Sequence, residues 1–188
     1  SMLMTSYRIR QIPRWWARIR MKRRVRCAVS SGEQLRVAFL LSDHAIFKWH
    51  STIHLMQKSE LYSPVIWIYA EHPARKPKLA GNIELCKERG YSFQLISEMD
   101  DIQIQEEYYR LHFLFFSLPY LGVDYPSIIL KTNRGRRPFH CYTHYSFKVS
   151  SATIENYGSW FMENVDIHFH PTIYHKKKFL KDKTWPWG

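Results

Sequence analysis

Leu35-Arg-Val-Ala-Phe-Leu-Leu41, followed directly by Ser42-Asp43, is the stretch of sequence that decides the fold. An apolar run of this length with polar residues on both sides is typical of a strand buried within a parallel sheet. Ser42 and Asp43 can cap a helix. Apolar residues then recur at helical spacing, at Ile46, Trp49, Ile53 and Met56. A strand, a polar turn and a helix in this order predict the first half of a βαβ unit.

The same alternation of strands and helices continues along the chain. We expect further strands over residues 65–70, 91–96, 111–118, 139–145 and 166–170. We expect helices over residues 80–89, 127–131, 151–162 and 172–180, with Gly90 ending the first of them and another short helix capped by Asp100. This spacing predicts an α/β fold, a Rossmann-like doubly wound parallel sheet, in a domain of residues 35–188.

The strand predicted over residues 139–145 ends in side chains that can do chemistry. It lies in the run Arg136–Lys148, where residues two apart line one face of a strand. Its end carries His144, Tyr145 and Lys148. Because ligands of open α/β sheets bind outside the carboxyl ends of the strands, this run predicts an active-site edge. The alternative is a strand whose histidines are merely hydrogen-bonded.

His144 is the residue that we expect to act as a base. The pKa of histidine, about 6.5, lies near working pH, so an imidazole can take the proton of an acceptor hydroxyl. Asp43 either orients this imidazole or only caps its helix. Other side chains that could line the same edge are predicted at the ends of these strands, at Ser42, Asp43, Tyr120, Tyr145 and Lys148.

Several kinds of site are disfavoured by the sequence. The loops GxGxxG and GxxxxGK[ST] are absent, and the chain has only seven glycines, so we expect no cofactor and no nucleotide held by such a loop. His140 and Cys141 should point to opposite faces of their strand, so we expect no metal site. The three cysteines are widely spaced and form no evident disulfide framework, which fits a reducing cytoplasm.

Residues 1–34 are predicted to form a basic amphipathic arm and a linker. Nine of the 28 Lys and Arg residues lie between Arg8 and Arg26, where there is no Asp or Glu. A helical projection places five apolar residues on one stripe, Ile9, Ile12, Trp15, Trp16 and Ile19. Because proline is tolerated in the first turn of a helix, we expect this helix to begin at Pro13.

Tryptophan on one side of a helix, with arginine around it, is typical of a helix that lies on a membrane surface. We expect contacts with anionic lipid from Arg10, Arg14, Trp15, Trp16, Arg18 and Arg20. There is no apolar run of about 18 residues, so no transmembrane helix is predicted, and we expect a cytoplasmic protein on the inner face of the cell membrane. The alternatives are a solvated arm, an arm packed on a partner, and arginine contacts with nucleic acid.

Several segments together resemble the N-terminal half of the CDP-glycerol glycerophosphotransferase family, which includes teichoic-acid and capsule polymerases and related glycosyltransferases. These segments are Val37–Asp43, Phe47–Trp49, Leu55-Met56, Pro64–Ile68, Phe115–Tyr120 and Cys141–Tyr145. The resemblance covers about residues 35–180. Two positions depart from the family pattern, because Leu118 replaces a glutamine and Ser146 replaces a glycine.

The resemblance implies the N-terminal half of a GT-B-type enzyme, which consists of two Rossmann-like halves. This half would receive a polysaccharide or lipid-linked acceptor and supply the histidine base at His144. The candidates for binding that acceptor are Ser42, Asp43, Tyr120, Tyr145 and Lys148. A C-terminal half without a counterpart in this sequence would bind the nucleotide donor, so we expect the chain alone to be inactive. The implied product is a bacterial surface polysaccharide, such as capsule, teichoic acid or lipopolysaccharide.

The alternative function is a basic, aromatic-rich module that binds nucleic acid or docks on a membrane without catalysis. Nucleic acid is the less favoured partner, because the sequence contains no RNA-binding signature and most aromatic residues fit apolar strand and helix patterns.

Overall fold

The computed structural model describes residues 2–42, 48–117, 137–143, 165–169 and 173, and of residues 2–14 it describes the backbone alone. Within these residues, six parallel strands form one sheet in the order β3-β2-β1-β4-β5-β6. The strands are β1 (Leu35–Leu41), β2 (Tyr62–Ile68), β3 (Phe93–Leu95), β4 (Phe113–Phe116), β5 (Phe139–Thr143) and β6 (Ile167–Phe169). This is the strand order of the Rossmann fold, so the predicted fold class is confirmed.

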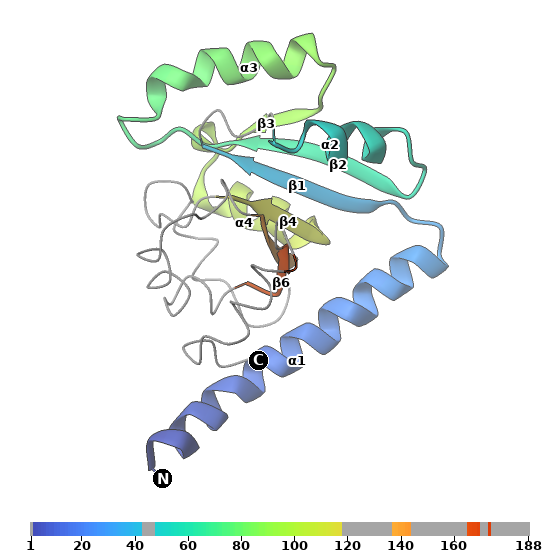
Figure 1. Cartoon of the computed structure of the whole chain (residues 1–188), viewed down its shortest axis with the longest axis vertical. Helices are drawn as coiled ribbons and strands as arrows, with labels where there is room; N and C mark the ends of the chain where they lie inside the picture. Colours follow the sequence, from blue (N-terminus) through green and yellow to red (C-terminus); the bar gives the residue numbers. More distant parts are fainter. Residues whose placement is uncertain (1, 43–47, 118–136, 144–164, 170–172, 174–188) are drawn as a thin grey trace.

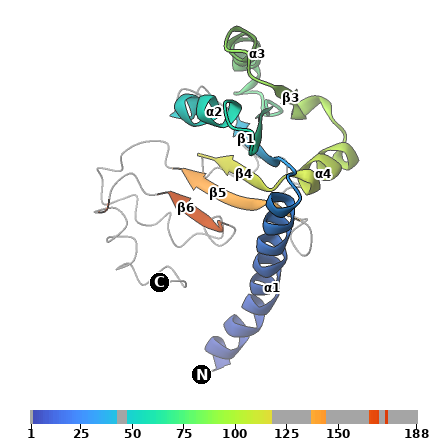
Figure 2. The same ribbon diagram turned by 90° about the vertical axis from the view of Figure 1, so that its right-hand side faces the viewer.

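Helices are packed on both faces of this sheet, and α2 and α4 lie on opposite sides of it (Figure 1, Figure 2). The helices are α1 (Met2–Ser30), α2 (His50–Gln57), α3 (Leu79–Glu88) and α4 (Asp101–Arg110), with short 3-10 helices η2 (Lys76–Lys78) and η3 (Ile96–Glu98). Alternate residues of β1 enter two separate apolar clusters. Phe39 joins the cluster of α2 and α3, and Leu40 joins the cluster of α4. Burial on both faces explains the continuous apolar run of β1.

Two local signals in the sequence are confirmed by the structure. Asp100 caps α4, because its carboxylate accepts from the backbone N–H of Gln103 at 2.8 Å while the Gln103 side chain accepts from the N–H of Asp100. Gly90 follows α3 with a φ of +66°, and the N–H of Tyr91 donates to the carbonyl of Cys86 at 2.8 Å. A left-handed residue there ends the helix, and glycine adopts it without strain.

The prediction for β2 was wrong at its start, because the strand begins at Tyr62 and includes Pro64. Pro64 pairs with Val37 of β1, whereas β3 pairs only with Ile66 to Ile68 of β2. The N–H of Ile66 points toward β3, where it donates to Ser92. The nitrogen of Pro64 lies on the same side, before β3 begins, so its missing N–H costs no ladder bond.

Other strands are shorter than predicted, and part of the prediction lies outside the described residues. β3 spans Phe93–Leu95 and β4 spans Phe113–Phe116, within the predicted ranges 91–96 and 111–118. The helices predicted over 127–131 and 151–162 lie outside the described residues, and of the one over 172–180 only Ile173 is described, as helical.

The prediction that the first helix begins at Pro13 was wrong, because α1 is continuous from Met2 to Ser30. A proline inside a helix loses one N–H bond and costs about 3 kcal/mol. The helix extends before Pro13 because good helix formers precede it as well, among them leucine, methionine, arginine and glutamine. Gly32, with a φ of +72°, then ends it within the predicted linker, where the N–H of Glu33 donates to the carbonyl of Ala28 at 2.9 Å.

The second half of α1 packs along the amino-terminal edge of the sheet rather than standing apart as an arm. Arg24 donates to the carbonyls of Arg110 and Leu111, just before β4, at 2.7 and 2.8 Å. Arg18 binds the carboxylate of Asp166, just before β6. Figure 2 shows α1 beside the sheet with β5 running away from it. Helix α1 therefore spans the starts of successive strands, at the edge opposite their carboxyl ends.

Candidate functional site

The carboxyl edge of the sheet brings together the ends of β1, β4 and β5. Ser42 follows β1 and Ser117 follows β4, and both residues are buried. β1 and β4 are neighbours at the point where the strand order reverses, which is where ligands bind in folds of this kind. The structure thus places the predicted residue Ser42 at the expected edge. The other predicted site residues lie outside the described residues, namely Asp43, Tyr120, His144, Tyr145 and Lys148.

The start of α2 is joined to the end of β5 by two hydrogen bonds. The ammonium group of Lys48 donates to the carbonyl of Thr143 at 3.1 Å, and the indole N–H of Trp49 donates to the Thr143 hydroxyl at 2.9 Å. Trp49 is buried, and its ring packs 5.4 Å from that of Phe39 in β1. In the sequence, Asp43 shortly precedes Lys48, and His144 directly follows Thr143. The two bonds therefore hold together the chain segments that lead to both predicted residues.

The side chain of Lys48 has a lowered pKa at this edge. Loss of hydration where its side chain lies against the end of β5 lowers the pKa of Lys48 from 10.5 to about 8. The residue as a whole is nevertheless exposed, so only part of the Lys48 side chain is removed from solvent. Lys48 can thus present either a cation or a neutral amine near pH 8.

The loop after β2 adds positive charge to the same edge. β2 is followed by Tyr69, whose hydroxyl donates to the Glu71 carboxylate at 2.7 Å. Four basic or titratable side chains follow in the loop and in η2, and these are His72, Arg75, Lys76 and Lys78. Together with Lys48, this loop adds positive charge to the described part of the edge, and Glu71 offsets one of these charges.

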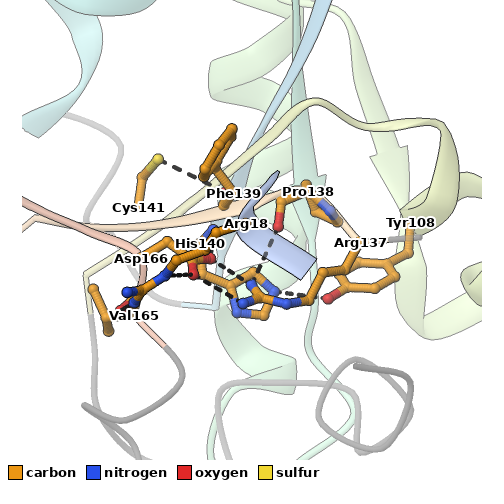
Figure 3. Close-up of polar contacts among 9 residues, drawn as sticks. All are labelled: Arg18, Tyr108, Arg137, Pro138, Phe139, His140, Cys141, Val165 and Asp166. Carbon is orange, nitrogen blue, oxygen red and sulfur yellow. Dashed lines mark hydrogen bonds and ion pairs between the residues drawn. The ribbon is translucent and has the colours of Figure 1, made fainter. Parts of the chain in front are cut away.

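A second polar cluster, built around Asp166, lies at the opposite, amino-terminal side of β5 and β6 (Figure 3). Arg137 binds both carboxylate oxygens of Asp166, one of them at 2.8 Å. Arg18 of α1 donates to the same carboxylate at 3.1 Å, and the backbone N–H of His140 does so at 2.9 Å. The imidazole of His140 in turn contacts the hydroxyl of Tyr108 in α4 at 2.7 Å.

This cluster is charged although it is buried. Burial alone would raise the pKa of the Asp166 carboxyl, but the adjacent Arg137 guanidinium and the N–H of His140 hold that pKa below its ordinary value. Burial raises the pKa of the Tyr108 hydroxyl, which therefore stays protonated. The groups satisfy one another and lie at the opposite edge of the sheet from the carboxyl ends of the strands. We assign the cluster a structural role.

His140 and Cys141 lie on opposite faces of the sheet, as predicted. The ring of His140 packs with Tyr108 and Phe116, whereas Cys141 belongs to the cluster of Phe39 on the other face. His168 of β6 packs edge-on against Tyr142. In the described part of the chain, no three His, Cys, Asp or Glu side chains come together as a metal site would require.

The residues predicted to contact lipid separate into different environments. Trp15 and Trp16 are 58% and 53% exposed, and Arg20 is exposed as well. Arg18 is turned inward to Asp166, which removes it from the lipid-facing set. Arg10 and Arg14 belong to α1, where the structure describes their backbone alone. Among the described residues, no helix combines the length and the apolar character that crossing a membrane requires.

Comparison of the chain with protein-family models, with curated proteins and with solved structures finds no match. The carboxyl edge therefore has to be interpreted from its own residues. Sequence reasoning missed the contacts of Lys48 and Trp49 with Thr143, which join residues more than ninety positions apart. The sequence signal for Lys48 was its place in the segment Phe47–Trp49 of the family resemblance, and Trp49 also belonged to the predicted apolar pattern of the helix.

Replacing Asp166 by asparagine should strongly destabilise the fold. The neutral side chain leaves Arg137 as an uncompensated buried charge, which typically costs about 3–5 kcal/mol of the free energy of unfolding. Urea unfolding should show a correspondingly lower midpoint, and Glu106→Gln on the exposed side of α4 should leave it unchanged. The Asp166 carboxyl has a lowered folded pKa, so its contribution is present above about pH 4 and is lost as pH falls through the folded value. The variant should lack this acid-sensitive component, and equal midpoints for Asp166→Asn and wild type would contradict the structural role.

The lowered pKa of Lys48 should appear in its chemical reactivity. Only a neutral amine reacts with an acylating reagent, so acetylation of Lys48 should rise through a midpoint near pH 8, well before an ordinary lysine with a pKa of 10.5. Competitive acetylation followed by mass spectrometry measures each lysine in one sample, and exposed Lys87 of α3 is the internal control. A midpoint for Lys48 equal to that of Lys87 would exclude the described contact with β5 in solution.

Proposed function

We propose that the chain is the acceptor-binding half of a transferase that builds a bacterial surface polysaccharide, either a glycosyltransferase or a glycerophosphotransferase. The observation that carries the proposal is the pair of hydrogen bonds from Lys48 and Trp49 to Thr143. They anchor the end of β5 beside the start of α2, at the edge where a Rossmann-like sheet binds its ligands. The positive loop after β2 suits an acceptor that carries phosphate.

In this proposal, His144 is the base of the reaction. As the acceptor oxygen forms its bond to the phosphorus of CDP-glycerol, the imidazole of His144 takes the hydroxyl proton and the bond to the departing CMP breaks. With a sugar nucleotide, the same oxygen would attack the anomeric carbon, and the nucleotide would leave. Ser42, Asp43 and Tyr120 would hold the acceptor from the ends of β1 and β4, and Tyr145 and Lys148 from beyond β5.

Lys48 has a place in the same proposal. An ammonium group that already donates to the carbonyl of Thr143 has further N–H bonds to offer, and the residue is exposed. It would bind a phosphate of the acceptor next to His144. Its low pKa implies that this contribution weakens as pH rises through about 8, because only the charged amine attracts phosphate.

The donor nucleotide would be bound by a second Rossmann-like half, which the family resemblance implies and which would complete the site across the carboxyl edge. The absence of glycine-rich phosphate loops from this sequence supports a donor site in the other half and an acceptor site in this one. We further propose that the enzyme works at the inner face of the cell membrane, where lipid-linked acceptors are located, with α1 in contact with the lipid.

The chain should bind an acceptor and not a donor. Calorimetry should detect binding of a synthetic glycerol-phosphate oligomer but no micromolar affinity for CDP-glycerol or CDP-ribitol. Lys48→Gln should weaken binding of the oligomer by about tenfold or more, because hydrogen bonds to charged groups contribute about 1.5–3 kcal/mol.

Lys87→Gln is the matched control for this measurement, since it removes the same charge from the exposed surface of α3. Micromolar affinity for either CDP compound would contradict the assignment to the acceptor side. Equal effects of the two lysine variants would mean that the oligomer binds by net charge alone.

His144→Ala should abolish turnover in the enzyme assembled with its donor half, while the urea midpoint and donor affinity stay unchanged. Loss of a general base lowers the rate by about 10²–10⁴-fold. His54→Ala, on the exposed surface of α2, should retain full activity. If the His144 variant keeps more than about a tenth of the wild-type rate, another residue is the base.

A further inference from the structure

We infer that α1 docks on an anionic membrane through one defined face, the outer face, which comprises Trp15, Trp16, Ile19, Arg20, Arg23 and Arg26. The inference rests on the membrane location proposed above, and it adds which residues make the contact and how the domain is oriented. It follows from how the structure divides the side chains of α1 between two faces.

The inner face of α1 is fixed to the domain. Ala17, Met21 and Ala28 are buried, and Met21 joins the same apolar cluster as Val37. Arg18 binds Asp166. Arg24 binds the carbonyls at the end of α4, where its charge also complements the helix dipole. Two arginines of the basic segment thus hold α1 in place.

The outer face combines exposed aromatic rings with positive charge. Trp15 and Trp16 pack edge to face with ring centroids 5.1 Å apart, and both are more than half exposed. Arg20, Arg23 and Arg26 are exposed too, as is Lys22 at the margin of this face. At 100° per residue, Ile19, Arg23 and Arg26 project from the same side of the helix as Trp15. There is no Asp or Glu in α1 to offset these charges.

An anionic lipid surface matches this combination better than a nucleic acid does. Tryptophan is enriched at the membrane interface, where its ring lies at the level of the head groups, and anionic lipid attracts the arginines nearby. A duplex would engage the arginines through its phosphates but would leave the paired tryptophans without a matching apolar environment.

The fold also sets the orientation of the docked domain. The inner face of α1 lies against the starts of the strands, so the outer face points away from the sheet and away from its carboxyl edge (Figure 2). The seven residues of β1 span about 23 Å along the strand. A docked domain therefore holds the candidate site away from the lipid, by up to about 20 Å. The acceptor group must then extend from the lipid surface to the candidate site. The end of a lipid-linked polymer can do so, whereas a group at the bilayer surface cannot.

Vesicle co-sedimentation of the full chain tests the docking face. Vesicles of phosphatidylcholine with phosphatidylglycerol should bind the chain, and added salt should weaken the binding. The triple variant Arg20→Gln, Arg23→Gln, Arg26→Gln and the double variant Trp15→Ala, Trp16→Ala should each lower the affinity at least about tenfold. The control Lys58→Gln, Lys87→Gln, Arg89→Gln removes the same number of exposed charges elsewhere, and it should lower the affinity by less than about threefold.

Competitive acetylation on the vesicles tests the orientation. Lys22, beside the outer face, should be protected when the chain binds, whereas Lys48 at the carboxyl edge should react as it does in solution. Protection of Lys48 without protection of Lys22 would reverse the orientation and overturn the inference.

Three other results would also overturn it. Unchanged affinity of the outer-face variants would show that a different surface binds, and equal losses in the control would show that net charge alone decides. Tighter binding to a DNA or RNA duplex than to vesicles of equal charge would make nucleic acid the partner.

Urea midpoints of all variants should equal that of wild type, since none of the replaced side chains is buried. Binding of the glycerol-phosphate oligomer in solution should be the same in the tryptophan variant as in wild type, so failure of the docking face is separable from failure of the acceptor site.

Discussion

The described structure depends most on the hydrogen bonds and ion pairs that the carboxylate of Asp166 makes. This carboxylate receives Arg137 from the start of β5, Arg18 from α1 and the backbone N–H of His140, and His140 continues the contact to Tyr108 of α4. One buried anion thus joins two strands and helices that are remote in sequence. A buried charge is tolerated only with such partners, because desolvation of an unpaired carboxylate costs several kcal/mol. The two outer strands of the sheet therefore depend on a polar centre, whereas β1 and β2 depend on apolar packing.

Helix α1 connects that centre to the surface of the molecule. Its two inward arginines fasten it along the amino-terminal edge, and this fixes which of its other side chains face outward. The arrangement leaves the carboxyl edge uncovered by α1. There, Lys48 and Trp49 join α2 to the end of β5 in much the same way as Asp166 joins the opposite end of β5 to α1. Both ends of β5 are thus held by side-chain contacts, which suits a strand that leads into the proposed base.

The sequence predicts well those features that depend on neighbouring residues, and it predicts poorly those that depend on residues far along the chain. The apolar run Leu35–Leu41, the capping residue Asp100 and the helix-ending Gly90 act within a few residues, so the α/β class, the parallel sheet and several helix ends follow from them. Pro64 misled the prediction of β2, because its effect depends on where β3 begins, which no local pattern reveals. The place of Ser42 at the end of β1 was predictable in the same local way. The residues that surround Ser42 were not, because they come from distant parts of the chain.

The sequence by itself determined the fold class, the direction of the strands and the opposite facing of His140 and Cys141, since these follow from periodicity and from short-range sterics. Only the tertiary structure decided the roles of the arginines in α1. A helical projection treats Arg18 and Arg20 alike as charges outside the apolar stripe, yet Asp166 binds the first and leaves the second exposed. The physical reason is that this partly buried ion pair requires two residues 148 positions apart to meet, and only the folded chain brings them within 3.1 Å.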